Sequence, residues 1–263
     1  QLNAHIDVAG LLPTGYCLET KKGSKMKFFI TLFALFFSTL SLADDHRPNS
    51  KYYGFYHFVA PDPAAVVAAT DKFYASDCGK AYPADVGLAE EVFNGAYQST
   101  HFFINTYQNA ADQEKAAEMF RSCPGALEFL ADLNAAGVIP TREYLGFALL
   151  EEGDWNQDAV FAKFDVIIEP QNQRAYAMAY AKMMKAAAED VGLRSWGNDL
   201  VGFGNDMFTN WVYLGAESLT QLDTIQQALF AHPAYTEFAQ NTAGMRVNVN
   251  TTQLQFLKAY PKQ

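Results

Sequence analysis

One pattern occurs twice in this chain, and this internal repeat constrains the fold more than any other feature. Residues 100–103 (THFF) align with residues 209–212 (TNWV), and at the same offset residues 123–124 (CP) align with residues 232–233 (HP). The offset stays constant without a gap between these points. We interpret the chain as two copies of one folding unit.

Each copy, residues 51–154 and residues 155–260, shows the order strand, helix, strand, strand, helix, strand. A unit with this βαββαβ order folds as a ferredoxin-like domain, a four-stranded antiparallel sheet with both helices on one face. Its other face stays bare and needs a partner. The sequence therefore predicts an α+β fold in which two tandem ferredoxin-like repeats pack sheet to sheet.

The predicted elements follow hydrophobic periodicity and turn residues. In the second helix of the first copy, Ala116, Met119, Phe120 and Cys123 fall at i, i+3, i+4 and i+7, which is one face of an α-helix. Predicted strands cover 52–60, 85–93, 100–107, 141–151, 160–168, 198–203, 209–215 and 246–260, and predicted helices cover 63–76, 110–123, 126–135, 173–190 and 219–232.

The N-terminal part of the sequence has the pattern of an export signal. Residues 26–43 combine a basic start at Lys27, an apolar run and small residues before Ala43, which predicts a signal peptide and a periplasmic or extracellular protein. The alternative is a membrane anchor, but the apolar run is shorter than the ~20 residues that a span needs. We interpret residues 1–25 as an upstream, non-native segment.

The net charge and the cysteines disfavour some classes of binding partner and one class of catalysis. The formal net charge is −10, which disfavours nucleic acid and anionic lipid as partners. Beyond the signal peptide the cysteines are Cys78 and Cys123, and an exported chain with an even count permits one disulfide between them. Two free buried thiols are the alternative. Neither cysteine lies in a CxxC pair, which disfavours redox catalysis.

The element order and the duplication make the chain resemble the dimeric α/β-barrel superfamily. In fused members of that superfamily two halves form one pseudo-dimer, and its members include cofactor-free monooxygenases of the antibiotic-biosynthesis type, haem-handling enzymes and small stress-response proteins. The resemblance implies a monomeric pseudo-dimeric α/β barrel with a cavity between the repeats. Because the fold hosts many chemistries, the resemblance implies no single activity.

Two histidines are the candidate catalytic residues. His57 lies on the first predicted strand and His101 on the third, which are neighbours in a βαββαβ sheet. If both face the bare side of the sheet, they point into the cavity, where one could act as a general base or haem ligand while Tyr107 or Asn105 polarises a substrate oxygen. The alternative is polar packing at the interface. Two histidines make an incomplete metal site, so we predict no metal.

The aromatic content, 14%, is consistent with a pocket for a flat apolar ligand, although aromatic residues also fill ordinary cores. The candidate pocket residues are Tyr53, Phe55, Phe103, Asn105 and Asn210, the last of which takes the place of His101 in the second copy.

The sequence shows no GxSxG, P-loop, HExxH or CxxCH motif. It thus leaves three functions open. The first is an exported small-molecule-binding or interaction protein, with no identifiable catalysis and no cofactor. The second is a cofactor-free monooxygenase or haem-linked enzyme that uses His57 and His101. The third is a structural envelope protein.

Overall fold

The computed structural model describes residues 51–204 and 207–263. The predicted upstream segment and signal peptide therefore lie outside the described residues. The first half contains strands β1 (Tyr52–Val59), β2 (Asp85–Phe93), β3 (His101–Tyr107) and β4 (Ile139–Glu152), and helices α1 (Pro63–Ala75), α2 (Asp77–Lys80), α3 (Ala110–Ser122) and α4 (Pro124–Ala135).

The second half repeats this order. It contains strands β5 (Val160–Ile168), β6 (Ser195–Phe203), β7 (Asn210–Ala216) and β8 (Arg246–Tyr260), helices α5 (Gln173–Ala187), α6 (Leu219–Ala231) and α7 (Pro233–Asn241), and the 3-10 turns η1 (Trp155–Gln157) and η2 (Pro170–Asn172). The short α2, η1 and η2 were not predicted, because segments of one turn have no periodicity to detect.

Corresponding elements of the halves match closely where the sequence repeat is clearest. Strands β3 and β7 have the same length and the same pattern of burial, and α3 and α6 also have equal lengths. In both halves a proline, Pro124 or Pro233, starts a new helix directly after the cap of the preceding one. Proline suits this place because the first turn of a helix does not need its missing N–H group.

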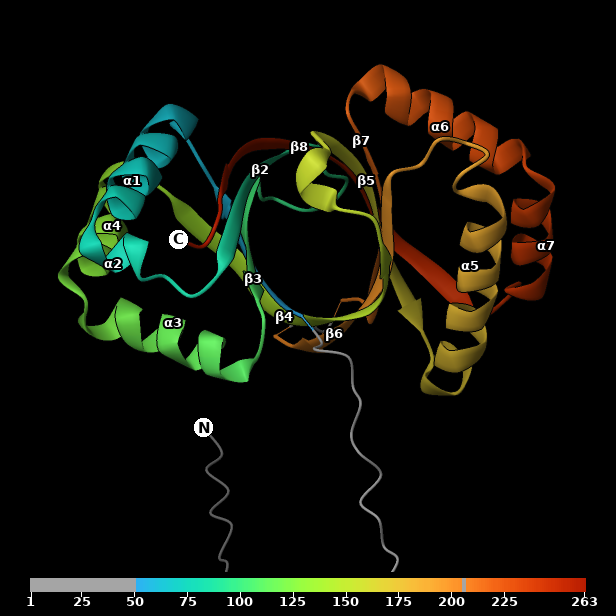
Figure 1. Ribbon diagram of the computed structural model, residues 1–263, viewed down its shortest axis with the longest axis horizontal. Helices are drawn as coiled ribbons and strands as arrows, with labels where there is room; N and C mark the ends of the chain where they lie inside the picture. Colours follow the sequence, from blue (N-terminus) through green and yellow to red (C-terminus); the bar gives the residue numbers. More distant parts are fainter. Residues whose placement is uncertain (1–50, 205–206) are drawn as a thin grey trace, which may run out of the picture. The chain divides into compact units, whose positions relative to one another are not determined.

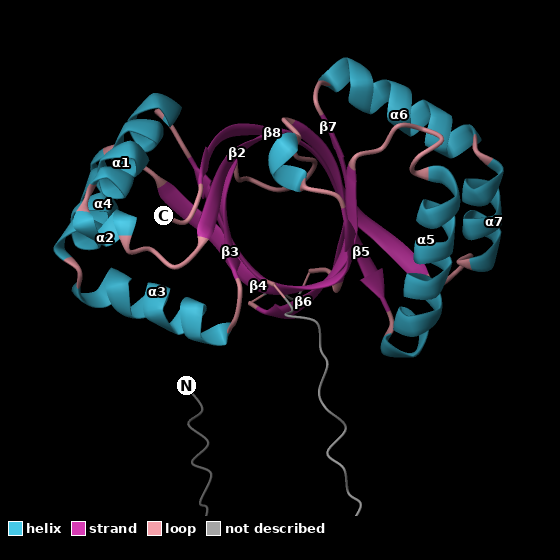
Figure 2. Cartoon of the chain, in the orientation of Figure 1, coloured by secondary structure: helices cyan, strands magenta, loops and turns pink. Residues whose placement is uncertain are grey.

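The strands form one closed antiparallel barrel in the order β1-β3-β2-β8-β5-β7-β6-β4 (Figures 1 and 2). The two halves join through the pairs β2–β8 and β4–β6. We predicted that the sheets pack face to face; in fact their edges also hydrogen-bond, and the inner faces line one barrel. Closure leaves no strand edge open to another chain.

Helices cover the outside of the barrel in two groups. Figure 2 shows α1 to α4 over the strands of the first half and α5 to α7 over those of the second. This arrangement makes three cores, one under each group of helices and one inside the barrel. The core inside the barrel is built mainly from aromatic side chains, namely Tyr53, Phe55, Phe102, Tyr144, Phe161, Phe208 and Trp211.

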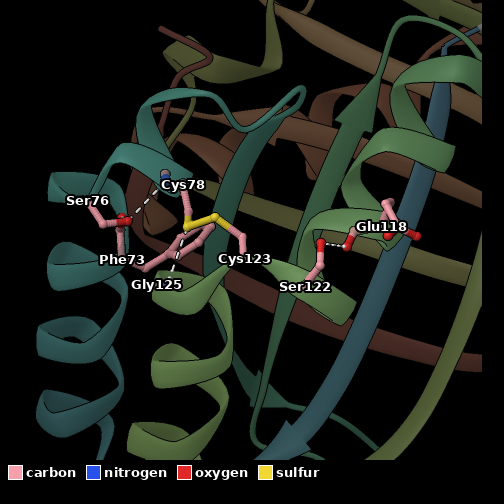
Figure 3. Close-up of a disulfide and its surroundings, with 8 residues drawn as sticks. Phe73, Ser76, Cys78, Glu118, Ser122, Cys123 and Gly125 are labelled. Atoms are coloured by element: carbon pink, nitrogen blue, oxygen red, sulfur yellow. Dashed lines mark hydrogen bonds between the residues drawn. A yellow bond between two sulfur atoms is a disulfide. The ribbon is translucent and has the colours of Figure 1, made fainter.

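A disulfide joins Cys78 in α2 to Cys123 at the start of α4, which confirms the predicted bridge (Figure 3). The Cα atoms are 6.2 Å apart, and Gly125 N–H donates a hydrogen bond to Cys78 Sγ at 3.3 Å. Because the bridge closes a long loop, it stabilises the first half by about 4 kcal/mol in the chain-entropy account.

None of the helices in the described part of the chain is long and apolar enough to cross a bilayer.

Candidate functional site

The strand register separates the two candidate histidines. His57 pairs with Phe102, and His101 pairs with Phe58, so the two imidazoles lie on opposite faces of the sheet. The predicted side-by-side pair in a cavity between the repeats is therefore wrong. His57 lies inside the barrel, whereas His101 lies on the face that the helices cover.

The ring of His57 is enclosed by other side chains. It packs against Phe102 and Tyr144 at centroid distances of 5.0 and 5.7 Å, and its Nδ1 lies 3.1 Å from Glu91 Oε1. Burial lowers the pKa of His57 to about 4, so the imidazole is neutral at pH 7. The barrel also holds a buried ion pair, Lys163–Asp165. The barrel cavity that Tyr53 and Phe55 line measures about 50 Å³, which leaves little room for a substrate.

His101 is held by its neighbours in a structural position. Its ring stacks on Phe58 with the centroids 6.0 Å apart, and its Nδ1 lies 2.8 Å from Thr100 Oγ1. Thr100 Oγ1 in turn accepts a hydrogen bond from Ala60 N–H. These contacts fix the turn where β3 begins and leave His101 outside the walls of the main cavities.

A second set of polar side chains, Tyr53, Glu151 and Asp199, lies inside the barrel near the β4–β6 pair. Tyr53 donates to Glu151 at 2.8 Å, and burial, followed by the nearby charge of Glu151, raises the pKa of Asp199 well above its usual value. Asp199 accepts a hydrogen bond from Leu149 N–H at 3.0 Å. Tyr53, predicted to line a ligand pocket, lines the small barrel cavity, and its hydroxyl is bound to Glu151 of β4.

A cavity of about 590 Å³ lies between the sheet and the helices of the first half. Strands β1, β2, β3 and β4 and helices α1, α3 and α4 supply its walls, which are mostly apolar and include Phe73, Phe103, Ala116, Phe120, Phe129 and Leu133. We predicted the cavity between the two repeats; it lies instead within one of them.

At four matched positions in or beside this space the first half carries a smaller side chain than the second. Counting from the first residues of α1 and α5, Val66 matches Tyr176 and Thr70 matches Tyr180. Counting in the same way, Val86 of β2 matches Trp196 of β6, and Ala116 of α3 matches Ile225 of α6. In the second half these larger side chains belong to the packed core.

The cavity contains one group of hydrogen-bonded polar side chains. Asn105 Nδ2 donates to the Tyr82 hydroxyl at 2.7 Å and to the Tyr107 hydroxyl at 3.0 Å. Burial raises the pKa of both tyrosines, so each is a neutral phenol at pH 7 and a hydrogen-bond donor rather than a base.

The predicted pocket residues thus divide among three places. Phe103, Asn105 and Tyr107 line the large cavity, and Phe55 lines the small barrel cavity. Asn210 lies under the second group of helices, where its side chain bonds Gln173 and leaves no open position for a ligand. Sequence reasoning missed Tyr74 and Tyr82 as site residues; the usable signal for Tyr74 was its place near the end of α1 beside Phe73, whereas Tyr82 follows α2, which was not predicted.

Haem does not fit the residues present. His57 is among the residues that line the large cavity, but its Nδ1 faces Glu91 and its ring packs against Phe102 and Tyr144 inside the barrel, where no open position is left on the ring for an iron atom. His101 lines neither the barrel cavity nor the large cavity. Among the described residues, no group of three or more histidine, cysteine, aspartate or glutamate side chains is arranged to hold a metal ion.

Comparison with known proteins identifies the fold. No protein-family model matches the sequence, and no curated protein matches it. A putative monooxygenase from Lactobacillus acidophilus NCFM matches in structure with a TM-score of 0.56 and 13% identity, covering 81% of this chain and 96% of that one.

Two further solved structures agree. A putative monooxygenase from Fusobacterium nucleatum matches with a TM-score of 0.57 and 12% identity over 81% of this chain and 94% of that one. An anthrone oxidase-like protein matches with a TM-score of 0.56 and 12% identity over 81% and 93%. At these identities the matches show the fold alone, and they agree with the superfamily resemblance noted from the sequence.

Proposed function

Since the chain has the dimeric α/β-barrel fold, we propose that it binds one small, largely apolar molecule in the cavity between the first half's sheet and helices. The observation that carries this proposal is the cavity itself. Its volume of about 590 Å³ lies within the range of small-molecule sites, and apolar walls with a few convergent polar groups are typical of such sites.

The composition of the walls favours binding over catalysis. The polar groups, Asn105, Tyr82 and Tyr107, can orient a ligand, but their protonation states at pH 7 provide no base. His57, the buried histidine of the barrel, has its ring among barrel side chains. The hydrogen-bonded group at the centre of the site can orient a ligand but supplies no base, which supports the small-molecule-binding function.

Titration with the neutral fluorescent probe N-phenyl-1-naphthylamine tests this proposal. We expect one site per chain, and we expect Ala116→Ile, which copies Ile225 of the second half, to lower the probe affinity at least about tenfold by filling the cavity. Ala111→Ile on the exposed face of the same helix is the control and should bind as the wild type does. Equal binding by Ala116→Ile would place the probe elsewhere and contradict the proposal.

The proposal includes a monomeric pseudo-dimer made of two tandem ferredoxin-like repeats. The repeated element order and the two intramolecular joints, β2–β8 and β4–β6, support it, because both sheets are completed within one chain. Light scattering coupled to gel filtration should give the mass of one chain. A stable dimer would contradict this part of the proposal.

We further propose that the protein is exported. The pattern of residues 26–43 and the disulfide between Cys78 and Cys123 support export, since structural disulfides persist in oxidising compartments. Expression of the full sequence, followed by N-terminal sequencing of the product, should give a chain that starts at Asp44. An intact N-terminus on protein recovered from the cytoplasm would contradict export.

An oxygenase that acts on an aromatic substrate in the same cavity is the second candidate, and the names of the structural neighbours favour it. The predicted catalytic set of His57, His101 and Tyr107 does not carry this candidate, because the three side chains do not share one cavity. Oxygen consumption with anthrone as substrate would support an oxygenase. Binding of anthrone without turnover would support the binding function and contradict the oxygenase.

A further inference from the structure

The hydrogen bonds of the large cavity specify the kind of ligand that it can hold. An amide nitrogen only donates hydrogen bonds, so the oxygens of Tyr82 and Tyr107 both accept from Asn105. The two phenolic oxygens are also 3.5 Å apart and bond each other, and Tyr107 bonds the hydroxyl of Tyr56. The three hydroxyls thus form one chain, from Tyr56 at the surface to Tyr82 inside.

The Tyr82 hydroxyl already accepts one bond from Asn105, and either of the two phenols can donate to the other. When Tyr107 is the donor, both lone pairs of Tyr82 are used, and its O–H proton is available to an acceptor on a ligand.

A second hydroxyl in the same wall also has no partner. Tyr74 is 8% exposed, lines the cavity, and its hydroxyl is buried without a hydrogen bond. Its ring stacks on Tyr260 and meets the edge of the Tyr82 ring at a centroid distance of 6.3 Å. A buried hydroxyl without a partner is unfavourable, and an acceptor on a ligand would remove this penalty.

The charges at the cavity favour a neutral ligand. Arg142 is the sole Lys or Arg side chain among the described residues of its wall, and its guanidinium lies over the Tyr97 ring at 3.6 Å and beside Glu91 at 3.8 Å. Glu143 adds a carboxylate to the same wall. A buried anionic ligand would therefore lack a free counter-charge, and its desolvation would be costly.

We propose that the ligand is a neutral, flat, apolar molecule with one carbonyl-type oxygen, which accepts hydrogen bonds from the hydroxyls of Tyr74 and Tyr82. A carbonyl oxygen has two lone pairs and can take both bonds. The aromatic walls, Phe73, Phe103 and Phe120 among them, suit a flat ring system. The inference rests on the proposed binding function and specifies its ligand class.

Three probes of one shape test the proposal by calorimetry: 2-acetylnaphthalene, its olefin isostere 2-isopropenylnaphthalene, and 2-naphthoate. We expect the ketone to bind about tenfold more tightly than the olefin, and the naphthoate to bind most weakly. Tyr74→Phe should lower the affinity for the ketone about tenfold and leave that for the olefin unchanged. Because the hydroxyl that it removes has no partner in the protein, this variant should fold with wild-type stability.

Tyr82→Phe should have the same selective effect, although it also removes an acceptor from Asn105, and Tyr235→Phe in α7 is the matched control with no effect. Equal affinity for ketone and olefin, or tightest binding of the naphthoate, would overturn the ligand class while the binding function stands. Absence of binding by all three probes would overturn the binding function as well.

Discussion

The two halves of this protein share one element order but differ in how their helices meet the sheet. Under α5 the core is filled by Tyr176, Tyr180, Met183 and Trp196, and a smaller cavity of about 390 Å³ is lined mainly by residues of α6, β5 and β8. Under α1 to α4 a cavity of about 590 Å³ remains. At matched positions such as Thr70 and Tyr180 the side chains of the two halves differ in volume. The larger of these two cavities therefore lies in the first half.

The two halves also differ in a disulfide and in the residue that takes its place. The first half ties α2 to α4 with a disulfide, whereas the second half places His232 at the site of Cys123, where its Nδ1 accepts a hydrogen bond from Ala234 N–H at 3.1 Å. A half with a hollow core loses packing energy, and a cross-link can offset that loss.

The largest predicted effect concerns truncation of matched helix residues. Tyr180→Ala should lower the free energy of unfolding by about 3–5 kcal/mol, because it empties a filled core. Thr70→Ala, at the matching place beside the existing cavity, should cost about 1 kcal/mol or less. Urea denaturation measures both. Equal losses would show that the first half is packed in solution.

Removal of the disulfide should come next. Replacing Cys78 and Cys123 together by serine should lower the free energy of unfolding by about 4 kcal/mol, and reductant should have no further effect on this variant. His232→Ala at the matching place should cost about 1 kcal/mol, the usual value of a lost helix cap. Guanidinium denaturation with and without reductant distinguishes the two. A double variant as stable as the wild type would refute the cross-linking role.

The smallest predicted effect is on the pH dependence of stability. It concerns a pair of matched strand positions inside the barrel, His57 of β1 and Asp165 of β5. Burial lowers the pKa of His57 to about 4, below the 6.5 of an exposed histidine. Below pH 6.5 the unfolded chain therefore binds more protons than the folded one, and stability falls as the pH drops towards 4.

The fall attributable to His57 amounts to about 3 kcal/mol, and it should be absent in His57→Gln. Denaturation curves at several pH values between 7 and 4, with wild type and variant side by side, measure it. The same slope in both proteins would assign the pH dependence to the carboxyl groups of the barrel instead.

The sequence predicted the strands and main helices well because their apolar spacing and prolines are local signals. It did not predict the faces of β3. Six of its residues are buried, with only Ile104 partly exposed, since the barrel interior covers one face and the helices cover the other. Without alternation between polar and apolar residues, strand parity could not tell whether His101 and Phe103 face the barrel or the helices.

The sequence alone determined the repeated βαββαβ order, which depends on spacing along the chain, and it permitted the bridge between Cys78 and Cys123 that the structure contains. Only the tertiary structure decided that His57 and His101 face apart, that the edges join into one barrel, and that Thr70 and Val86 border a cavity where Tyr180 and Trp196 pack in the second half. A cavity is a difference between the volume that the backbone encloses and the volume that converging side chains occupy, and that convergence exists only in the folded chain.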